Sequence, residues 1–260
     1  LCRSGSGKGA PAMQAAAKGR SLWDDARRRL FRNKAAVASM IVLALLVVAA
    51  VVGPHLTAYT YDEINKDDVW LGPLQNGHLI GTDSLGRDLL ARLLMGLRVS
   101  LAIGLIATFV SLVIGVAWGA VAGFAGGRLD ELMMRFVDVL YSLPFIFFVI
   151  LLMVTFGSNI ILIFVAIGAV EWLTMSRIVR GQTLTLKHKE FVEAARAAGL
   201  GQGAIIARHI VPNLLGPVVV YVTLTIPAVI IAESFLSFLG LGVQPPMASL
   251  GTLIATGAQD

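Results

Sequence analysis

The residues that could carry out chemistry in this sequence are few, and their spacing matches no common catalytic or metal-binding pattern. The chain of 260 residues has four histidines and one cysteine, Cys2, and these form neither a metal-ligand set nor a nucleophile–histidine–acid triad. The run Ser6-Gly7-Lys8-Gly9 lacks the upstream strand, the glycine spacing and the Ser or Thr after the lysine that a phosphate-binding loop needs. We therefore expect no catalytic, cofactor or metal site in this chain.

The composition places the chain in a lipid bilayer. It is 57% hydrophobic and only 14% charged, with a mean hydropathy of +0.80, whereas soluble domains carry about 25% charged residues. A net charge of +5 could indicate nucleic acid, but no Lys or Arg follows His209, and a nucleic-acid surface would cluster cations with aromatic residues. Membrane lipid is the expected surrounding, and nucleic acid is not an expected partner.

The apolar runs predict an all-α, polytopic membrane protein with five spans. Residues 1–20 are expected to be a disordered tail and 21–34 a basic amphipathic segment, followed by a transmembrane domain over 35–260. The expected spans are 35–52, 99–124, 136–156, 161–174 and 214–231. Pro144 should kink the third span. Asp138, in that span, could be a proton or ion site, although a place in the first helical turn favours a structural role.

The distribution of Lys and Arg predicts the orientation. The basic flank before residue 35 places the N-terminus in the cytoplasm. Segments 125–135 and 176–212 are then cytoplasmic, and segments 53–98 and 232–260 are external. In the first external segment, Thr82 or Asp83 could cap a helix. The leucine stripe that follows predicts an interfacial helix that lies against the outer leaflet and leads into the next span, with Leu85, Leu89, Leu93 and Leu97 on one face.

The second span carries small residues at every fourth position. These are Ala107, Ser111, Gly115, Gly119 and Gly123. Small residues let helices approach closely in a membrane, where the hydrophobic effect does not hold them together. The pattern predicts a packing seam rather than a ligand groove.

The most informative stretch is the charged segment from Phe191 to Pro212. Phe191, Ala194, Ala195 and Ala198 are spaced as one small apolar face of a helix. Gly199, Gly201 and Gly203 should interrupt it, because glycine readily adopts the angles that end a helix. A second short helix, 204–211, should then meet Pro212. The segment predicts a helix-turn-helix presented at the membrane surface.

These residues resemble a known family. Glu193-Ala194-Ala195, with Gly199 and Pro212 after it, resembles the EAA loop of importer-type ABC permeases. His209 and Val211 stand where the general pattern has Ile and Leu. The runs Gly81-Thr82-Asp83 and Glu233 to Gly242 resemble the oligopeptide and dipeptide branch, and within it most closely the C subunits of oligopeptide permeases.

The resemblance implies the type I permease fold and a set of partners. These are a homologous second permease subunit, two cytoplasmic ATPases that bind ATP and magnesium, and an external peptide-binding protein. It also implies a bacterial inner-membrane location and a peptide cargo. Docking on an ATPase would involve Glu193, Ala194, Ala195, Gly199 and Pro212. The family has a sixth span, so we expect the sequence given to be truncated or incomplete at its end.

Three residues are candidates for the transport pathway. Glu233, expected just past the fifth span, could meet the amino terminus of a peptide at the external mouth. The alternative is an interfacial acid bonded to backbone amides of its own loop. Tyr221 and Thr225 lie in the fifth span and are the other two candidates. A permease for another substrate, such as nickel, and an ion-coupled secondary transporter remain the alternative functions; the sequence shows no internal repeat typical of the latter.

Overall fold

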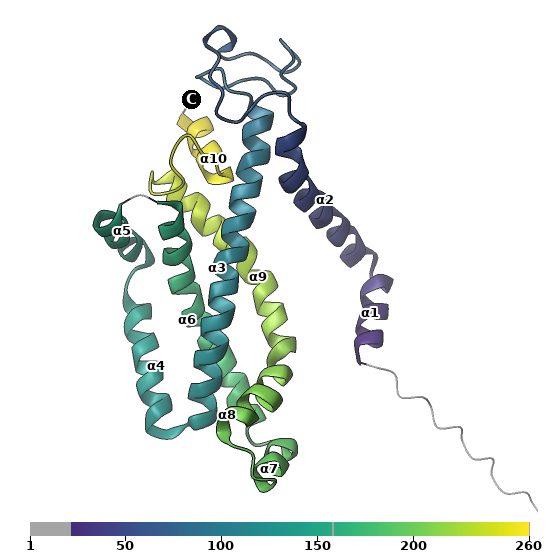
Figure 1. Cartoon of the computed structure of the whole chain (residues 1–260), viewed down its shortest axis with the longest axis vertical. Helices are drawn as coiled ribbons and strands as arrows, with labels where there is room; N and C mark the ends of the chain where they lie inside the picture. Colours follow the sequence, from purple (N-terminus) through teal and green to yellow (C-terminus); the bar gives the residue numbers. More distant parts are fainter. Residues whose placement is uncertain (1–21, 158, 260) are drawn as a thin grey trace, which may run out of the picture. The chain divides into compact units, whose positions relative to one another are not determined.

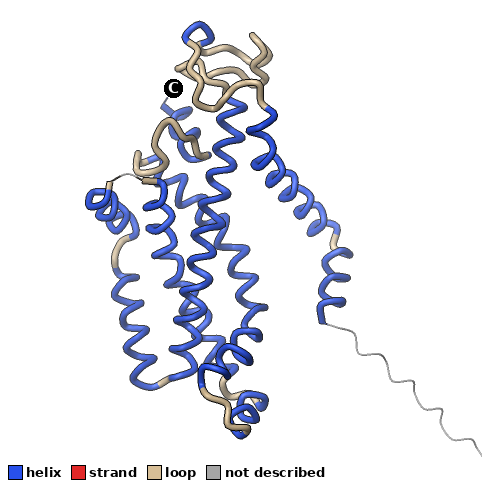
Figure 2. The backbone as a smooth tube through the Cα atoms, viewed as in Figure 1, coloured by secondary structure: helices blue, strands red, loops and turns tan. Residues whose placement is uncertain are grey.

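The computed structural model describes residues 22–157 and 159–259, and these form helices joined by loops (Figure 2). The predicted tail, 1–20, lies outside the described residues. The chain divides into two compact units, Leu1–Leu45 and Leu46–Asp260. In the first unit, α1 (Leu22–Arg32) ends at Asn33. Asn33 Oδ1 then accepts hydrogen bonds from the backbone of Ala35 and Ala36, which caps the start of α2 (Lys34–Leu56).

The helix α3 (Leu89–Ala125) is one continuous element of 37 residues. It begins at Asp88, whose Oδ1 accepts from the backbone N–H of Ala91 at 2.7 Å. A helix that leads into the span was expected from the leucines, and Leu89, Leu93 and Leu97 do lie in one, but it is the start of α3 itself and Leu85 precedes it. The interfacial position of these leucines stays a prediction. Asp88 caps the helix, where Thr82 or Asp83 was expected to do so.

The predicted third span is two helices rather than one. The helices α4 (Gly127–Ser142) and α5 (Phe145–Phe156) meet at an angle of 82°. Leu143 between them is extended, because the ring of a following proline disfavours helical angles. Pro144 then caps α5. The effect expected of Pro144 is present, but it is a break and not a kink.

The remaining helices are α6 (Ile160–Leu186), α7 (Glu190–Ala197), α8 (Gln202–Ile205), the π-helix η2 (Ile206–Ile210), α9 (Val211–Phe238) and α10 (Leu250–Gln259), with a 3-10 turn η1 (Lys66–Asp68) in the loop before α3. Two of them, α6 and α9, are longer than the spans expected there. From Gln202 to Phe238 the helix is continuous over 37 residues. The expected separation at Pro212 is therefore wrong, and Gly203 lies inside α8 rather than interrupting it.

Three of the described helices are long and apolar enough to cross a membrane. They are Lys34–Leu56, Leu89–Ala125 and Gln202–Phe238, and the bent pair α4–α5 raises the number to as many as four. The expected fourth span lies within α6. The count of five spans stays a prediction.

The glycine seam of α3 is confirmed, and it faces α6 (Figure 1). A Cβ added to Gly115 would lie 2.5 Å from the Cβ of Met175, and one added to Gly123 would lie 2.8 Å from the carbonyl oxygen of Arg180. At Gly119 the added atom would collide with the carbonyl oxygen of Ser176. The two backbones are thus too close to admit any side chain between them.

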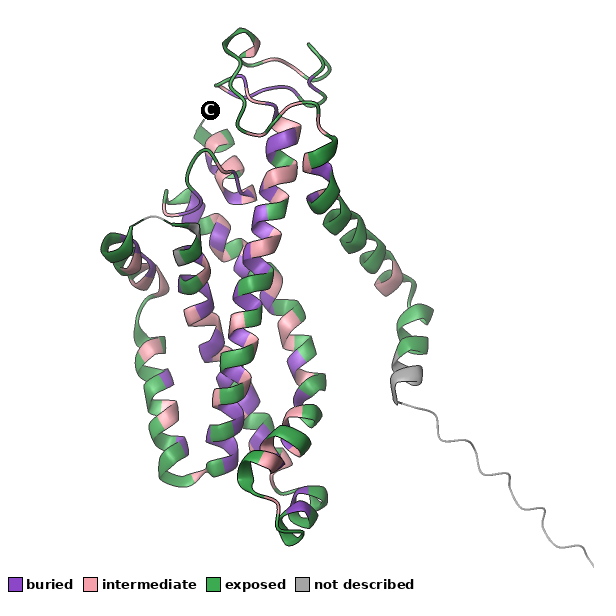
Figure 3. Ribbon diagram, viewed as in Figure 1, coloured by how far each residue is buried: buried purple, intermediate pink, exposed green. Residues whose placement is uncertain are grey.

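The core is built where α3, α6 and α9 meet. Ile103, Ile167 and Val229, one from each helix, are fully buried in a single apolar cluster. A buried stripe runs along the length of α3 in Figure 3, in keeping with its place between the other two helices. By contrast, α2 exposes most of its apolar side chains, as a helix in contact with lipid would.

Replacing Gly119 with valine should destabilise the protein. The new side chain meets backbone atoms of α6, which cannot rotate away, so the cost should reach about 3 kcal/mol, the upper end of overpacking effects. Thermal unfolding of the detergent-solubilised protein should shift down by about 5 °C or more. Gly181→Val is the control, because an added Cβ at Gly181 has no atom within 4 Å. Equal unfolding temperatures for the two variants would contradict the close approach.

Candidate functional site

The helices α7 and α8 and the turn 198–201 between them are here called the α7–α8 hairpin. One face of this hairpin is buried against the rest of the protein. Val192 and Ala195 are buried and pack in a cluster with Phe124 of α3 and Ile205 of α8. Four neighbouring residues of the hairpin are exposed: Phe191, Glu193, Ala194 and Ala198. Of the small apolar face predicted from the sequence, only Ala195 therefore points inward. The rest forms an uncovered surface.

The turn of the hairpin depends on the backbone of Gly199. Its φ is +80°, a conformation that side chains disfavour, and this confirms its expected role in ending the helix. The amide of Leu200 donates to the carbonyl of Ala195 at 3.1 Å, and that of Gly199 donates to Arg196 at 2.9 Å. This pair of bonds is the Schellman motif of helix ends. Leu200 then packs against the cluster below.

Two cations tie this region to the end of α3. The guanidinium of Arg196 lies 5.2 Å from the ring centre of Phe124. Lys187, just after α6, donates from Nζ to the carbonyl of Gly123 at 3.1 Å, where the negative end of the α3 dipole favours a cation. These contacts could not be predicted from the sequence, because the partners lie far apart in the chain.

The hairpin brings four of the predicted residues together. Glu193, Ala194, Ala195 and Gly199 lie within it, and Pro212 follows on α9, where it is exposed. Within residues 22–157 and 159–259, no ion pair engages the carboxylate of Glu193. Figure 1 shows α7 and α8 at one end of the second unit, with α10 at the other. The hairpin can thus offer a free acid and a slim surface to another protein.

Two ion pairs fasten α4 to α6. The Nε and Nη2 of Arg180 donate to the two carboxylate oxygens of Asp130 at 2.5 and 2.7 Å, which is the strong bidentate arrangement. Arg177 donates to Asp138 at 2.7 Å and lies 4.2 Å from the ring centre of Tyr141. Asp138 sits in the interior of α4 rather than in a first turn, and its carboxylate is occupied by a structural pair.

Glu233 lies inside α9 and is fully buried, rather than just past the end of a helix. Its carboxylate accepts from the hydroxyl of Ser237 at 2.6 Å and from that of Ser100 at 3.2 Å. Ser100 in turn accepts from the backbone amide of Leu250, and Ser237 lies 3.4 Å from Ser249. The carboxylate therefore joins α3, α9 and α10. Neither the expected position nor the alternative of loop amides is found, because α9 continues beyond the predicted span.

Tyr221 and Thr225 also face the protein's own helices. The hydroxyl of Thr225 donates to the carbonyl of Tyr221 at 3.0 Å, within the same helix. Thr225 is buried, and Tyr221 packs against the apolar cluster that contains Leu214 and Val218. The described contacts do not gather these two residues and Glu233 around one cavity.

The loop between α2 and α3 is organised around Asp83. Its carboxylate accepts from the backbone amides of Leu85 and Arg87, both at 2.9 Å, from Arg87 Nε at 2.8 Å, and from Arg92. Burial would raise the pKa of Asp83, but the amides of Arg87 and Leu85 and the charges of Arg87 and Arg92 together hold that pKa below its ordinary value. These contacts therefore stabilise the fold above the unfolded-state pKa of about 4 and are lost only as pH falls through the lower folded value.

Close backbone contacts around Asp83 leave no room for a side chain at Gly86. Gly86 has a φ of +73°, and an added Cβ there would collide with the carbonyl of Asn65. Next to it, His78 Nδ1 lies 2.7 Å from a carboxylate oxygen of Asp88, the residue that caps α3. The loop thus fixes the start of α3 from several sides.

Two family descriptions match this sequence. Residues 115–258 match the binding-protein-dependent transport system inner membrane component, and residues 21–73 match the N-terminal TM domain of oligopeptide transport permease C. The first match covers more than half of the chain. The chain therefore belongs to the family of binding-protein-dependent transport system inner membrane components, and its helices form the type I ABC permease fold.

Individual relatives agree with this family. The chain is 54% identical to the oligopeptide transport system permease protein OppC of Haemophilus influenzae, over 93% of this chain and 78% of that protein. It is 53% identical to OppC of Escherichia coli strain K12, over 93% of this chain and 80% of the relative. The chain is 45% identical to the dipeptide transport system permease protein DppC of Bacillus subtilis, over 91% of this chain and 74% of that protein. The resemblance to the oligopeptide and dipeptide branch is confirmed.

Substitutions at Glu233 should separate its charge from its hydrogen bonds. Glu233→Gln keeps polar atoms for Ser100 and Ser237, so the free energy of unfolding should change by less than about 1 kcal/mol. Glu233→Leu leaves both buried hydroxyls without this partner and should cost about 2–4 kcal/mol. Thermal unfolding in detergent measures both, with the exposed acid variant Glu63→Leu as control. A leucine variant as stable as the glutamine variant would contradict the structural role.

Proposed function

We propose that this chain is the membrane-embedded permease subunit of an ATP-driven importer of peptides, forming half of the translocation pathway. The observation that carries the proposal is the identity of 42–54% to proteins named oligopeptide or dipeptide transport system permeases, over about nine-tenths of this chain. Identity at this level extends through α3, α6 and α9, which build the packed core of the protein.

The proposed assembly has four kinds of subunit. This chain pairs with a homologous second permease subunit, and two cytoplasmic ATPases bind ATP and magnesium. An external protein delivers the peptide, in keeping with a family described as binding-protein-dependent. ATP hydrolysis is assigned to the ATPases, so this chain has a mechanical and not a catalytic role.

The α7–α8 hairpin is the proposed contact with an ATPase. Its outer surface offers Glu193 to a basic partner, and exposed alanines such as Ala194 let the helix enter a cleft. Its inner face, through Val192 and Ala195, is packed on the same cluster as α3, α6 and α9. Movement of the hairpin by a partner is therefore passed directly to the packed core. Pro212 belongs to the helix that carries this movement.

The proposed orientation puts the N-terminus and the hairpin in the cytoplasm of a bacterial cell with the loop 57–88 outside. The distribution of Arg and Lys supports this orientation, because these residues are enriched in cytoplasmic segments. They flank the hairpin and precede α2, and none follows His209. A single cysteine at Gln202, in a background without Cys2, should not react with an impermeant thiol reagent on intact spheroplasts. Labelling of this position from outside would reverse the orientation.

Uptake by membrane vesicles tests the function. Vesicles containing the complete importer should accumulate a labelled tripeptide when ATP is supplied, and an ionophore should leave the initial rate unchanged. Uptake abolished by the ionophore would instead indicate an ion-coupled transporter. In the same assay, Gly199→Val should abolish uptake, because valine is strained at a φ of +80° by about 1 kcal/mol or more and the turn of the hairpin shifts.

The hairpin variants also distinguish coupling from folding. Gly199→Val and Glu193→Lys should both insert into the membrane normally, since no span is altered, yet retain less ATPase on copurification. Gly201→Val is a matched control, because Gly201 is exposed and has a negative φ of −67°. Wild-type uptake with normal ATPase retention in the first two variants would show that the hairpin is only a connector.

A further inference from the structure

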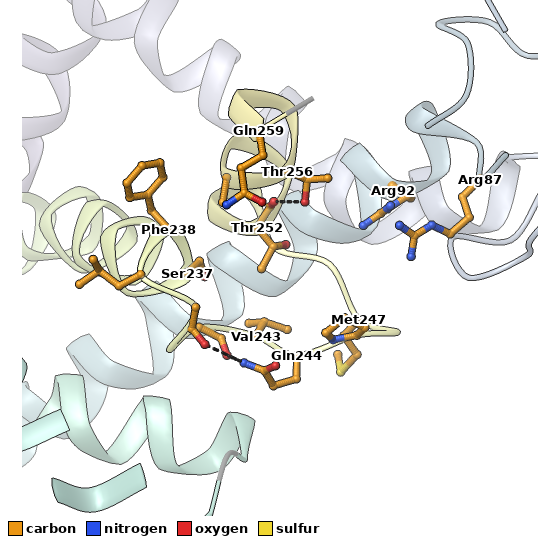
Figure 4. A pocket seen from close by; sticks show the side chains of 15 residues that line it. Arg87, Arg92, Ser237, Phe238, Val243, Gln244, Met247, Thr252, Thr256 and Gln259 are labelled. Carbon is orange, nitrogen blue, oxygen red and sulfur yellow. Dashed lines mark hydrogen bonds between the residues drawn. The ribbon is translucent and has the colours of Figure 1, made fainter. Parts of the chain in front are cut away.

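A cavity of about 410 Å³ lies beside α10 (Figure 4), the helix at the other end of the second unit from the α7–α8 hairpin (Figure 1). One side is formed by Arg87 and by Arg92 at the start of α3. The other side is formed by Gln244 and by three residues of α10, Thr252, Thr256 and Gln259. The cavity is thus lined by two cations and by several amide and hydroxyl groups.

The two guanidinium groups share one carboxylate. Arg87 Nε and Arg92 Nη1 both donate to the same oxygen of Asp83, so the three residues together carry one excess positive charge. These contacts use one nitrogen of each guanidinium, which has five donors. No described residue lining this cavity is acidic.

Arg92 is the informative member of this group. It is 5% exposed, and its Nε has no hydrogen-bond partner among the residues that the structure describes. An unsatisfied donor on a buried cation is costly. An anion in the cavity would balance the excess positive charge of Arg87, Arg92 and Asp83.

We propose that this cavity binds the terminal carboxylate of the transported peptide, an inference that rests on the proposed function. A carboxylate is planar and matches the fork of donors on a guanidinium. The amide nitrogen of Gln244 already donates to Gly240 and Gly242, but its oxygen and the amide of Gln259 can bond the last peptide group. Val243 and Met247 in the wall can contact its side chain. A phospholipid fits less well, because its acyl chains need a continuous apolar wall.

Direct binding to the purified importer tests the proposal, with the external binding protein left out so that only sites on the membrane subunits contribute. The probes are a labelled tripeptide with a free carboxylate and the same tripeptide with an amidated end. The wild type should bind the acid form more tightly than the amide. Arg87→Gln should weaken binding of the acid form about tenfold, as loss of a charge-assisted hydrogen bond implies, and leave the amide form unchanged.

Two further variants distinguish loss of the carboxylate site from a general defect in folding. Gln244→Glu places a carboxylate in the cavity without touching the contacts of Asp83, and it should weaken binding of the acid form selectively. Arg98→Gln removes a cation of α3 that does not line this cavity and should change neither form. A defect in folding would instead lower binding of both peptides.

The outcomes that overturn the proposal are distinct from failure of the proposed function. Equal binding of the acid and amide forms by the wild type, no detectable binding, or equal losses of both forms in Arg87→Gln would each remove the carboxylate site. Displacement of the acid form by an anionic phospholipid but not by unlabelled acid tripeptide would assign the cavity to lipid. If vesicles still take up the tripeptide with ATP, only this inference fails.

Discussion

The close contact between α3 and α6 is the constraint on which the rest of the structure depends. In a bilayer, apolar side chains gain little by leaving lipid, so helices are held by tight packing and by polar contacts. Tight packing comes from Gly115, Gly119 and Gly123, which let the two backbones touch. A polar contact comes from Arg180 of α6, which binds Asp130 of α4. The hairpin then rests on the end of the same pair of helices.

Much of the helical framework could be predicted from the sequence, because apolar runs and small-residue spacing are local patterns. The seam on α3 and the role of Gly199 are of this kind. Helix boundaries were less predictable. The leucines after Leu85 fit an interfacial helix and the start of a span equally well. At Pro212, a proline that usually ends a helix is accommodated because the π-helix before it shifts the bonding, with the amide of Val211 donating to Ile206.

The polar contacts of the site could not be predicted, because they join residues that are distant in the chain. Ser100 and Glu233 are 133 positions apart, and Asp130 and Arg180 are 50 apart. Only the packing of α3, α4, α6 and α9 brings them together. For the same reason Glu233, which looks like an isolated acid in the sequence, is a fully bonded one in the fold. The arginines beside Asp83 likewise form a pair only once the loop has closed.

The uninterrupted helix from Gln202 to Phe238 has a mechanical consequence. At a rise of ~1.5 Å per residue, its 37 residues give a rod of about 55 Å, while the hydrocarbon layer is about 30 Å thick. An upright rod of this length exceeds that layer by roughly 25 Å, so the helix is long enough to act as a lever. Pro217 and Pro227 each remove a backbone donor inside it. Its stiffness is lowest at those two points, and bending under load will concentrate there.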